Sequence, residues 1–305
     1  MAVNVFIDGS AGTTGLRIRE RLESRPDLHL LTLPDEKRKD LSAREEILNA
    51  CDIAFLCLPD AAAIEAVSLI KNPNVIVLDT STAHRTDPGW TYGFPELSEA
   101  HKKAVETSKR IAVPGCHASG FIALIYPLVK EGIIPADTFL AATSLTGYSG
   151  GGKKMIAQYE DPERPVSYDS PRQYGLSQMH KHLPEMVAVT GLQTAPAFSP
   201  IVADFYSGME VTIPLPTDQS DAIKKIYQDL YQGPIVYYKE DSPADGFLAA
   251  NALTGKDTME VRVFGNSERV LLSALFDNLG KGASGAAIEC MNLALGLPPE
   301  TGLVL

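Results

Sequence analysis

Cys116 has the surroundings of a reactive thiol. The apolar residues 111–113 predict a buried strand, residues 114–115 a turn, and apolar residues at helical spacing over 118–129 a helix. This places Cys116 at a helix N-terminus, where unpaired N–H groups and the helix dipole favour a thiolate. The pattern therefore favours a nucleophile. The alternative is a small, buried and inert cysteine, which is the commoner role of the residue.

Two further residues with useful chemistry are His180 and His182. Histidine has the right pKa to act as general acid and base at neutral pH. On a strand the two side chains would face opposite ways, and Pro184 marks the start of a helix. Catalysis, metal binding and plain surface placement all remain open on these residues alone. Metal binding is the weakest of the three, because no third ligand is spaced nearby.

A glycine-rich turn opens the chain. The apolar run 3–7 leads into Gly9-x-x-Gly12-x-x-Gly15 and then into a helical pattern at 16–22. Glycines let the backbone approach a pyrophosphate, and the N–H groups of the helix N-terminus hold it. The spacing is not the common Gly-x-Gly-x-x-Gly, but its place after the first strand predicts a dinucleotide site. The residues expected to contact the cofactor there are Gly9, Ser10, Gly12, Thr13, Thr14 and Gly15.

The loop after the second predicted strand, 29–33, bears on which dinucleotide binds. An NAD-specific fold places an acidic residue here to hold the ribose hydroxyls. This loop offers mixed charge instead, with a basic cluster that includes Lys37 and Arg38. We therefore expect NADP, the alternative being a solvated loop without a ligand.

The elements that position these residues alternate in the first half of the chain. Strands at 53–58 and 75–79 are near-continuous apolar runs, and helices are predicted at 44–50 and 61–70. In such parallel sheets, ligands bind beyond the carboxyl ends of the strands. Ser81 and Arg85 follow one strand end and are candidate substrate contacts. Arg85 suits a phosphate, although an arginine on a surface loop is an equally good interpretation.

From about residue 135 the pattern changes to longer strands and loops. We expect an extended loop at 162–173, a mostly antiparallel sheet and a final apolar helix that packs back on the first domain. The glycine run 147–154 is either a linker or a loop packed close to a ligand, which makes Gly147 a candidate substrate contact. The strands are predicted at 138–146, 208–215, 235–238, 259–264 and 270–276, and the helices at 222–231 and 283–295.

The predicted fold is α/β, with a Rossmann-type dinucleotide-binding domain and a second α+β domain on a mixed or antiparallel sheet. The first domain is expected at 1–118, completed by the C-terminal helix 283–305. The second, at 119–282, would be catalytic and would mediate dimerisation.

Composition narrows the possible partners. The 305 residues carry a net charge of −11, which argues against nucleic acids and anionic membranes as partners. Residues 1–8 show no targeting leader, and no apolar run has transmembrane length, so we expect a cytoplasmic protein. The other three cysteines, Cys51, Cys57 and Cys290, lie in apolar surroundings and are expected in the core.

Four motifs taken together resemble the N-acetyl-gamma-glutamyl-phosphate reductase family in its short, type 2 form. They are Gly-Ser-Ala-Gly-Thr-Thr-Gly at 9–15, Val-Pro-Gly-Cys-His-Ala-Ser-Gly at 113–120, His-Lys-His-Leu-Pro-Glu at 180–185 and Asp-Asn-Leu-Gly-Lys-Gly-Ala-Ser-Gly at 277–285. The resemblance implies an enzyme of arginine biosynthesis that interconverts N-acetyl-glutamyl 5-phosphate and the 5-semialdehyde with NADPH. The mixed second domain suggests a homo-oligomer, a dimer or tetramer, and the residue spacing indicates no metal site.

The resemblance assigns roles to residues. Cys116 would be the nucleophile, and His180 or His182 the acid/base. Asn278 and Gly282 would approach the nicotinamide, and Ser81 and Arg85 the substrate. Where the longer form has Ser-Ala-Asp-Phe-Arg, this chain has Ser-Thr-Ala-His-Arg at 81–85, a departure at His84.

Two rival functions fit parts of the pattern. Aspartate-semialdehyde dehydrogenase shares the architecture, the cysteine and the acyl-phosphate chemistry, but the motifs at 180–185 and 277–282 favour the N-acetylglutamyl substrate. A non-catalytic dinucleotide-binding sensor would explain the glycine turn but not Cys116 or the paired histidines.

Overall fold

A six-stranded parallel sheet forms the centre of the first unit. The computed structural model describes residues 2–10 and 12–305, and this unit comprises the described residues up to Pro95, with Glu99–Pro114 and Ala283–Leu303. The strand order is β2-β1-β3-β4-β6-β5, with parallel pairing throughout. The strands are β1 (Val3–Asp8), β2 (Leu28–Leu31), β3 (Ile53–Leu56), β4 (Ile76–Asp79), β5 (Thr91–Tyr92) and β6 (Arg110–Ala112).

Helices cover both faces of this sheet, as the buried apolar runs in β3 and β4 predict. One face packs against α1 (Thr13–Leu22), α4 (Glu99–Thr107) and α9 (Gly285–Ala294). The other packs against α2 (Leu41–Ala50) and α3 (Asp60–Leu69). Helix α9 contributes Ala287, Ile288 and Met291 to the core of this unit.

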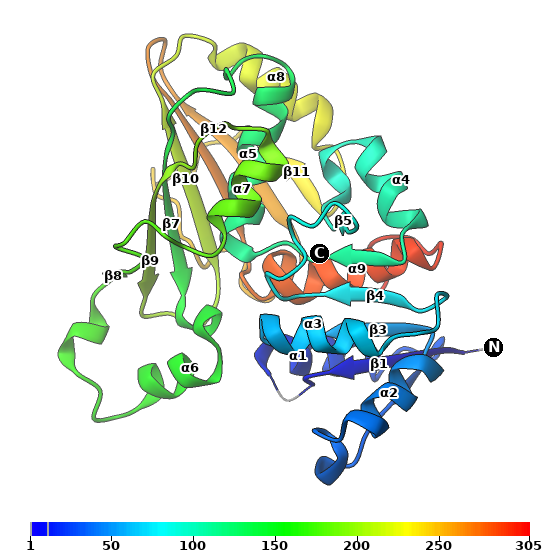
Figure 1. Ribbon diagram of the computed structural model, residues 1–305. Coiled ribbons are helices and arrows are strands. Elements are labelled where there is room, and N and C mark those ends of the chain that lie inside the picture. Colours follow the sequence, from blue (N-terminus) through cyan, green and yellow to red (C-terminus); the bar gives the residue numbers. More distant parts are fainter. Residues whose placement is uncertain (1, 11) are drawn as a thin grey trace. The chain divides into compact units, whose positions relative to one another are not determined.

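The second unit contains a seven-stranded mixed sheet in the order β11-β12-β13-β10-β7-β9-β8 (Figure 1). The pairs β11–β12 and β7–β9 are parallel and the rest antiparallel. This unit comprises Glu96–Ser98, Gly115–Gly282 and Val304–Leu305. Its strands are β7 (Ala141–Gly147), β8 (Arg172–Gln173), β9 (Ala197–Ala203), β10 (Met209–Leu215), β11 (Val236–Tyr238), β12 (Met259–Gly265) and β13 (Val270–Phe276).

Helix α5 (Cys116–Lys130) lies on this sheet and contacts β10 and β13. The approach is close because Gly120 faces the sheet: a Cβ there would lie 2.5 Å from the Val211 side chain. Helix α7 (Leu183–Thr190) packs on α5, and α8 (Ser220–Leu230) packs on both α5 and β12 (Figure 1).

One alternative for this unit is excluded and one prediction is wrong. Of the two alternatives for the run 147–154, the linker is excluded, because Tyr148–Gly151 form a 3-10 turn and α6 (Gly152–Glu160) follows directly. Stacking of the Tyr148 ring on Tyr159, at 4.7 Å between ring centroids, ties that turn to α6. The segment 162–173 is not wholly extended loop, since it contains a 3-10 turn at Val166–Asp169 and the short strand β8.

No helix in the described part of the chain is both long enough and apolar enough to cross a membrane.

Candidate active site

The helix N-terminus predicted at Cys116 is confirmed. Cys116 is the first residue of α5 and is half-buried, with Gly115 as the extended N-cap. The Gly115 N–H donates to the buried carboxylate of Glu185, at 3.1 Å, and its carbonyl accepts from the backbone N–H of Ser119, at 2.8 Å. The turn that presents the thiol is therefore held by α5 and by the side chain of Glu185 on α7.

His180 and His182 do not lie on a strand and do not face opposite ways. They occupy the turn before α7, where their rings meet edge to face at 4.8 Å between centroids. Both rings also pack against His117, at 5.3 Å and 5.6 Å. The turn allows what strand geometry would forbid, because residues i and i+2 of a turn can direct their side chains to one point.

His117 was quoted in the sequence motif, but sequence reasoning assigned it no role. Its ring is 3% exposed and bridges two hydroxyls, with Nδ1 at 2.7 Å from Ser144 Oγ and Nε2 at 2.6 Å from Tyr174 Oη. Burial, with smaller contributions from His180 and Lys181, lowers the pKa of His117 to about 3. The ring is therefore an uncharged imidazole at neutral pH.

His180 is also neutral at physiological pH. Burial, and then the charge of Lys181, lower the pKa of His180 to about 4. The Nδ1 of His180 accepts a hydrogen bond from the backbone N–H of His182, at 3.2 Å. A neutral imidazole has one protonated nitrogen, so His180 carries its proton on Nε2 and can donate from there.

The other thiols are set apart from Cys116. Burial raises the pKa of both Cys51 and Cys57 to about 12, and Cys290 is fully buried and donates to the Gly93 carbonyl. The thiols of Cys51 and Cys57 therefore stay protonated at neutral pH. Cys51 and Cys290 are buried, as predicted, whereas Cys57 is only partly buried. Among the described residues, no group of three or more His, Cys, Asp or Glu is arranged to hold a metal.

The 277–282 motif forms the turn that packs against the nucleophile. A Cβ at Gly282 would lie 3.0 Å from the Cβ of Cys116, so this position needs a small residue. The buried amide of Asn278 accepts from the Gly208 N–H, at 2.8 Å, and donates to Ser149 Oγ, at 3.0 Å. Asn278 thus anchors the turn at the end of β7, where a Cβ at Gly147 would lie 2.6 Å from the Tyr206 carbonyl oxygen.

Ser81 and Arg85 lie beyond β4, as predicted, in a network that sequence reasoning missed. The fully buried Asp79 carboxylate accepts from Ser81 Oγ, at 2.7 Å, and contacts Nδ1 of His84, at 2.6 Å. Arg85 donates from Nε to the Val113 carbonyl, at 2.9 Å, and from Nη2 to the Thr80 carbonyl. His84, where the sequence departs from the longer form, is thus part of the scaffold that shapes this loop.

The glycine turn after β1 has the steric features of a pyrophosphate cradle. Gly9 has φ +86°, and a Cβ there would lie 2.2 Å from the Cys57 carbonyl oxygen; one at Gly15 would lie 2.6 Å from Gly9 O. The protein itself therefore requires both glycines. At Gly12 the nearest atom would be 3.4 Å away, an ordinary contact, so nothing in the protein demands a glycine there. A pyrophosphate that lies close to the protein backbone would require a glycine at this position.

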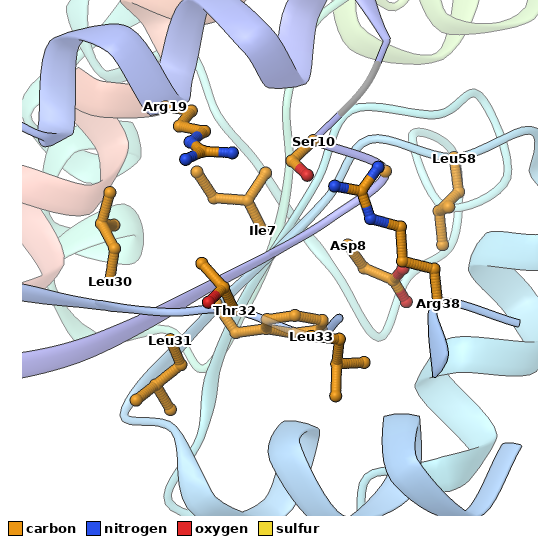
Figure 2. Close-up of a pocket in the computed structure, with 12 residues that line it drawn as sticks. Ile7, Asp8, Ser10, Arg19, Leu30, Leu31, Thr32, Leu33, Arg38 and Leu58 are labelled. Carbon is orange, nitrogen blue, oxygen red and sulfur yellow. The ribbon is translucent and has the colours of Figure 1, made fainter. Parts of the chain in front are cut away.

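A pocket of about 160 Å³ adjoins this turn (Figure 2). Apolar side chains from the ends of β1 and β2 line it, and Figure 2 shows the guanidinium groups of Arg19 and Arg38 directed toward Ser10. Lys37 does not line the pocket, whereas Arg19 from α1 does. The full lining is Phe6, Ile7, Asp8, Gly9, Ser10, Arg19, Leu30, Leu31, Thr32, Leu33, Arg38 and Leu58.

The acidic residue expected of an NAD-specific site is not found at the end of β2. Thr32 and Leu33 line the pocket there. Asp8 is the acidic residue in the lining, and its carboxylate is paired with Arg44 at 2.9 Å. Burial raises the pKa of Asp8. The pocket thus has two guanidinium groups, which pair with the carboxylates of Glu23 and Asp35, and one carboxylate, which is paired with Arg44.

Two family models match this chain. Residues 4–105 match the family model of the semialdehyde dehydrogenase NAD binding domain, and residues 116–278 match that of the semialdehyde dehydrogenase dimerisation domain. The fold and site therefore define a protein of the semialdehyde dehydrogenase class.

Solved structures agree on the fold. Aspartate semialdehyde dehydrogenase II from Vibrio cholerae, complexed with ASA, aligns with a TM-score of 0.70 over 97% of this chain and 99% of that chain, at 16% identity. Aspartate semialdehyde dehydrogenase with NADP from Candida albicans aligns with a TM-score of 0.64 over 96% and 98%, at 15% identity.

Closer relatives identify the family. N-acetyl-gamma-glutamyl-phosphate reductase 2 from Nostoc sp. is 44% identical over 98% of both chains. N-acetyl-gamma-glutamyl-phosphate reductase from Rhizobium etli is 46% identical, covering 97% of this chain and 99% of its own. This chain belongs to the N-acetyl-gamma-glutamyl-phosphate reductase family, which confirms the resemblance carried by the four motifs.

Proposed function

We propose that this protein reduces N-acetyl-L-glutamyl 5-phosphate to N-acetyl-L-glutamate 5-semialdehyde and phosphate with NADPH, in arginine biosynthesis. The observation that carries the proposal is Cys116 at the N-terminus of α5, in a chain that belongs to this reductase family throughout its length. The thiolate of Cys116 attacks the acyl carbon, phosphate leaves, and a thioester forms. Covalent catalysis of this kind divides one difficult step into two easier ones.

NADPH, when bound, would supply the hydride that reduces the thioester. His182, as acid/base, would give a proton to the oxygen of the resulting thiohemiacetal and take it back as the C–S bond breaks, which frees the aldehyde and restores the thiolate. We assign this role to His182 because the Nδ1 of His180 already accepts from the backbone. The Nε2–H of His180 is left to donate to the substrate.

The remaining contacts follow from the family and from residue chemistry. Ser81 and Gly147 are proposed substrate contacts, and Arg85 neutralises the leaving phosphate. Asn278 and Gly282 shape the turn on which the nicotinamide is proposed to lie.

NADP is the proposed cofactor because of the pocket beside the glycine turn. Gly9, Ser10, Gly12, Thr13, Thr14 and Gly15 form the turn that would hold the pyrophosphate. Arg38, with Arg19 in place of Lys37, would hold the 2′-phosphate, since guanidinium groups match phosphate geometry.

A homo-oligomer is also proposed, formed through the second unit. The sheet register puts Thr143, Thr212, Pro214 and Leu271 on one face, and Thr143, Pro214 and Leu271 are exposed. The opposite face packs on the helices. Size-exclusion chromatography with light-scattering detection tests the oligomeric state. A monomer at micromolar concentration would contradict the proposal.

The test of function is phosphate-dependent reduction of NADP⁺ with N-acetylglutamate semialdehyde, with aspartate semialdehyde run beside it. Activity on the first substrate alone is expected. Activity on aspartate semialdehyde alone would keep the mechanism and change the pathway, and activity on neither would favour a dinucleotide sensor.

A Cys116→Ser variant separates an enzyme from a sensor. It should bind NADPH with the wild-type Kd, because the cofactor contacts proposed above do not include the sulfur. Turnover should fall below detection, since an uncharged hydroxyl is a poor nucleophile. Steady-state kinetics and a fluorescence titration check both points, and retained turnover would refute the thioester mechanism.

A further inference from the structure

The reaction steps above give no role to the buried imidazole of His117. His117 follows Cys116 directly and is held between two hydroxyls, Ser144 Oγ at 2.7 Å and Tyr174 Oη at 2.6 Å. Packing alone does not require an imidazole at this position, because a phenyl ring would fill the same space. What distinguishes the imidazole is its two hydrogen bonds.

The donors and acceptors of Ser144, His117 and Tyr174 restrict how these three side chains can be hydrogen-bonded. A neutral imidazole has one donor and one acceptor nitrogen, so one hydroxyl donates to His117 and the other accepts from it. Ser144 is fully buried on β7, under the helix that begins with Cys116. When Ser144 donates to Nδ1, the Nε2–H of His117 donates to Tyr174 Oη. The Tyr174 proton is then directed away from His117 and can be donated to another group.

The surroundings of Tyr174 indicate that group. Tyr174 is half-buried beside His180, with 5.8 Å between ring centroids. Burial, and then the charge of Cys116, raise the pKa of Tyr174 well above its usual range. The hydroxyl therefore stays protonated, and its contact with His117, the residue after Cys116, places it beside the N-terminus of α5 that carries the sulfur. The charged or titratable groups around this cluster are Cys116 on α5 and His180, Lys181 and His182 in the turn before α7.

We infer that Ser144 and His117 are positioning residues that orient the Tyr174 hydroxyl as a hydrogen-bond donor to the Cys116 thiolate and to the oxygen of the group attached to it. This inference rests on the proposed function. Tyr174 is then a catalytic residue, since it touches the reacting atoms, and His117 acts only through it. A donor aimed at developing negative charge stabilises the transition state without reorganisation.

The test is a double-mutant cycle between Tyr174→Phe and His117→Phe, both of which keep a ring in place. Each single variant should lower kcat about 10²-fold, the lower end of the range for loss of one such donor. The double variant should lose no more than either single variant, because the two residues act as one unit. His117→Gln, whose amide can still donate and accept, should retain more turnover than His117→Phe. Ser144→Ala breaks the chain at its other end and replaces His117→Phe if that variant does not fold.

A second measurement does not depend on turnover. The pH dependence of Cys116 alkylation by iodoacetamide, followed by peptide mass spectrometry, should shift to higher pH in Tyr174→Phe and His117→Phe, because a thiolate that loses a donor is harder to form. Tyr237→Phe is the matched control: its hydroxyl also donates, to Glu260 at 3.0 Å, but it lies on β11, away from this cluster.

Each outcome decides between the two proposals. Wild-type kcat and an unshifted alkylation profile in Tyr174→Phe would overturn the inference, as would fully additive losses in the double variant. A shifted alkylation profile in a protein without reductase activity would leave the hydrogen-bond chain standing and reject the proposed function.

Discussion

At the residue scale, His180 and His182 differ in what their ring nitrogens are free to do. Nδ1 of His180 is already an acceptor for the His182 backbone N–H, so a base must be sought at His182. We expect His182→Asn to lower kcat about 10²- to 10⁴-fold, the usual range for a general acid/base. His180→Asn should mainly raise KM, because it removes a donor to the substrate. Steady-state kinetics of both variants check this, and the reverse order would assign the base to His180.

The two arginines of the pocket allow a second prediction at this scale. Charge reversal in Arg19→Glu with Arg38→Glu should weaken NADPH binding about 10²- to 10⁴-fold, since each of the two charge-assisted hydrogen bonds contributes ~1.5–3 kcal/mol. NADH, which lacks the 2′-phosphate, should be affected much less. Lys37→Glu is the control, because Lys37 lies in the same exposed turn as Arg38 but does not line the pocket. Fluorescence titration gives the affinities of the wild type and both variants for the two cofactors. Equal losses for both cofactors would place the 2′-phosphate elsewhere.

How far the site could be predicted depends on the sequence distance between its members. Cys116 and the glycine turn were found because strand, turn and helix signals adjoin them. The His117, Ser144 and Tyr174 cluster could not be found this way, because its hydrogen bonds join residues 27 and 57 positions apart. Arg19 was missed for a related reason: a helix delivers it to a pocket that the sequence analysis had assigned to the loop after β2 alone.

At the scale of the element, helix α5 carries Pro127 in its interior, where the missing N–H leaves the Ala123 carbonyl without its helical donor. The buried Tyr231, just after α8, donates to that carbonyl at 2.7 Å. Tyr231→Phe should therefore lower the free energy of unfolding by about 1–3 kcal/mol, the cost of an unsatisfied buried acceptor, and leave kcat unchanged.

Urea denaturation measures this loss. In a Pro127→Ala background, position 127 regains its backbone N–H, so the same Tyr231→Phe change should cost much less there. An equal loss in both backgrounds would mean that Tyr231 stabilises the protein by packing rather than through this hydrogen bond.

Local signals also explain which elements the sequence analysis found. The buried strands β3 and β4 were predicted because unbroken apolar runs identify them whatever the tertiary context. Strand β9 was not predicted, since Ser199 and Pro200 interrupt its alternation, and its pairing with β7 supplies what its own sequence lacks. Helix α6 was missed because glycines dominate its start, where stacking of Tyr148 on Tyr159 fixes the turn instead.

At the scale of the whole molecule, stability is linked to pH through His117. Its pKa is about 3 in the folded protein and ordinarily 6.5. Between these values the unfolded chain binds a proton that the folded protein excludes, so the free energy of unfolding falls as pH falls. From pH 7 to pH 5 the loss is about 2 kcal/mol, since the unfolded imidazole titrates through about 1.5 units of that interval at ~1.36 kcal/mol each.

The comparison of wild type with His117→Phe isolates this contribution, because all other titratable groups are common to both proteins. Urea denaturation at pH 7 and pH 5 should show a drop in stability that is about 2 kcal/mol larger in the wild type. The free energy of unfolding of the variant, relative to that of the wild type, thus rises as the pH falls, whatever the difference at neutral pH. The same drop in both proteins would mean that the folded imidazole takes up a proton near its ordinary pKa, which would contradict its burial as a neutral bridge between Ser144 and Tyr174.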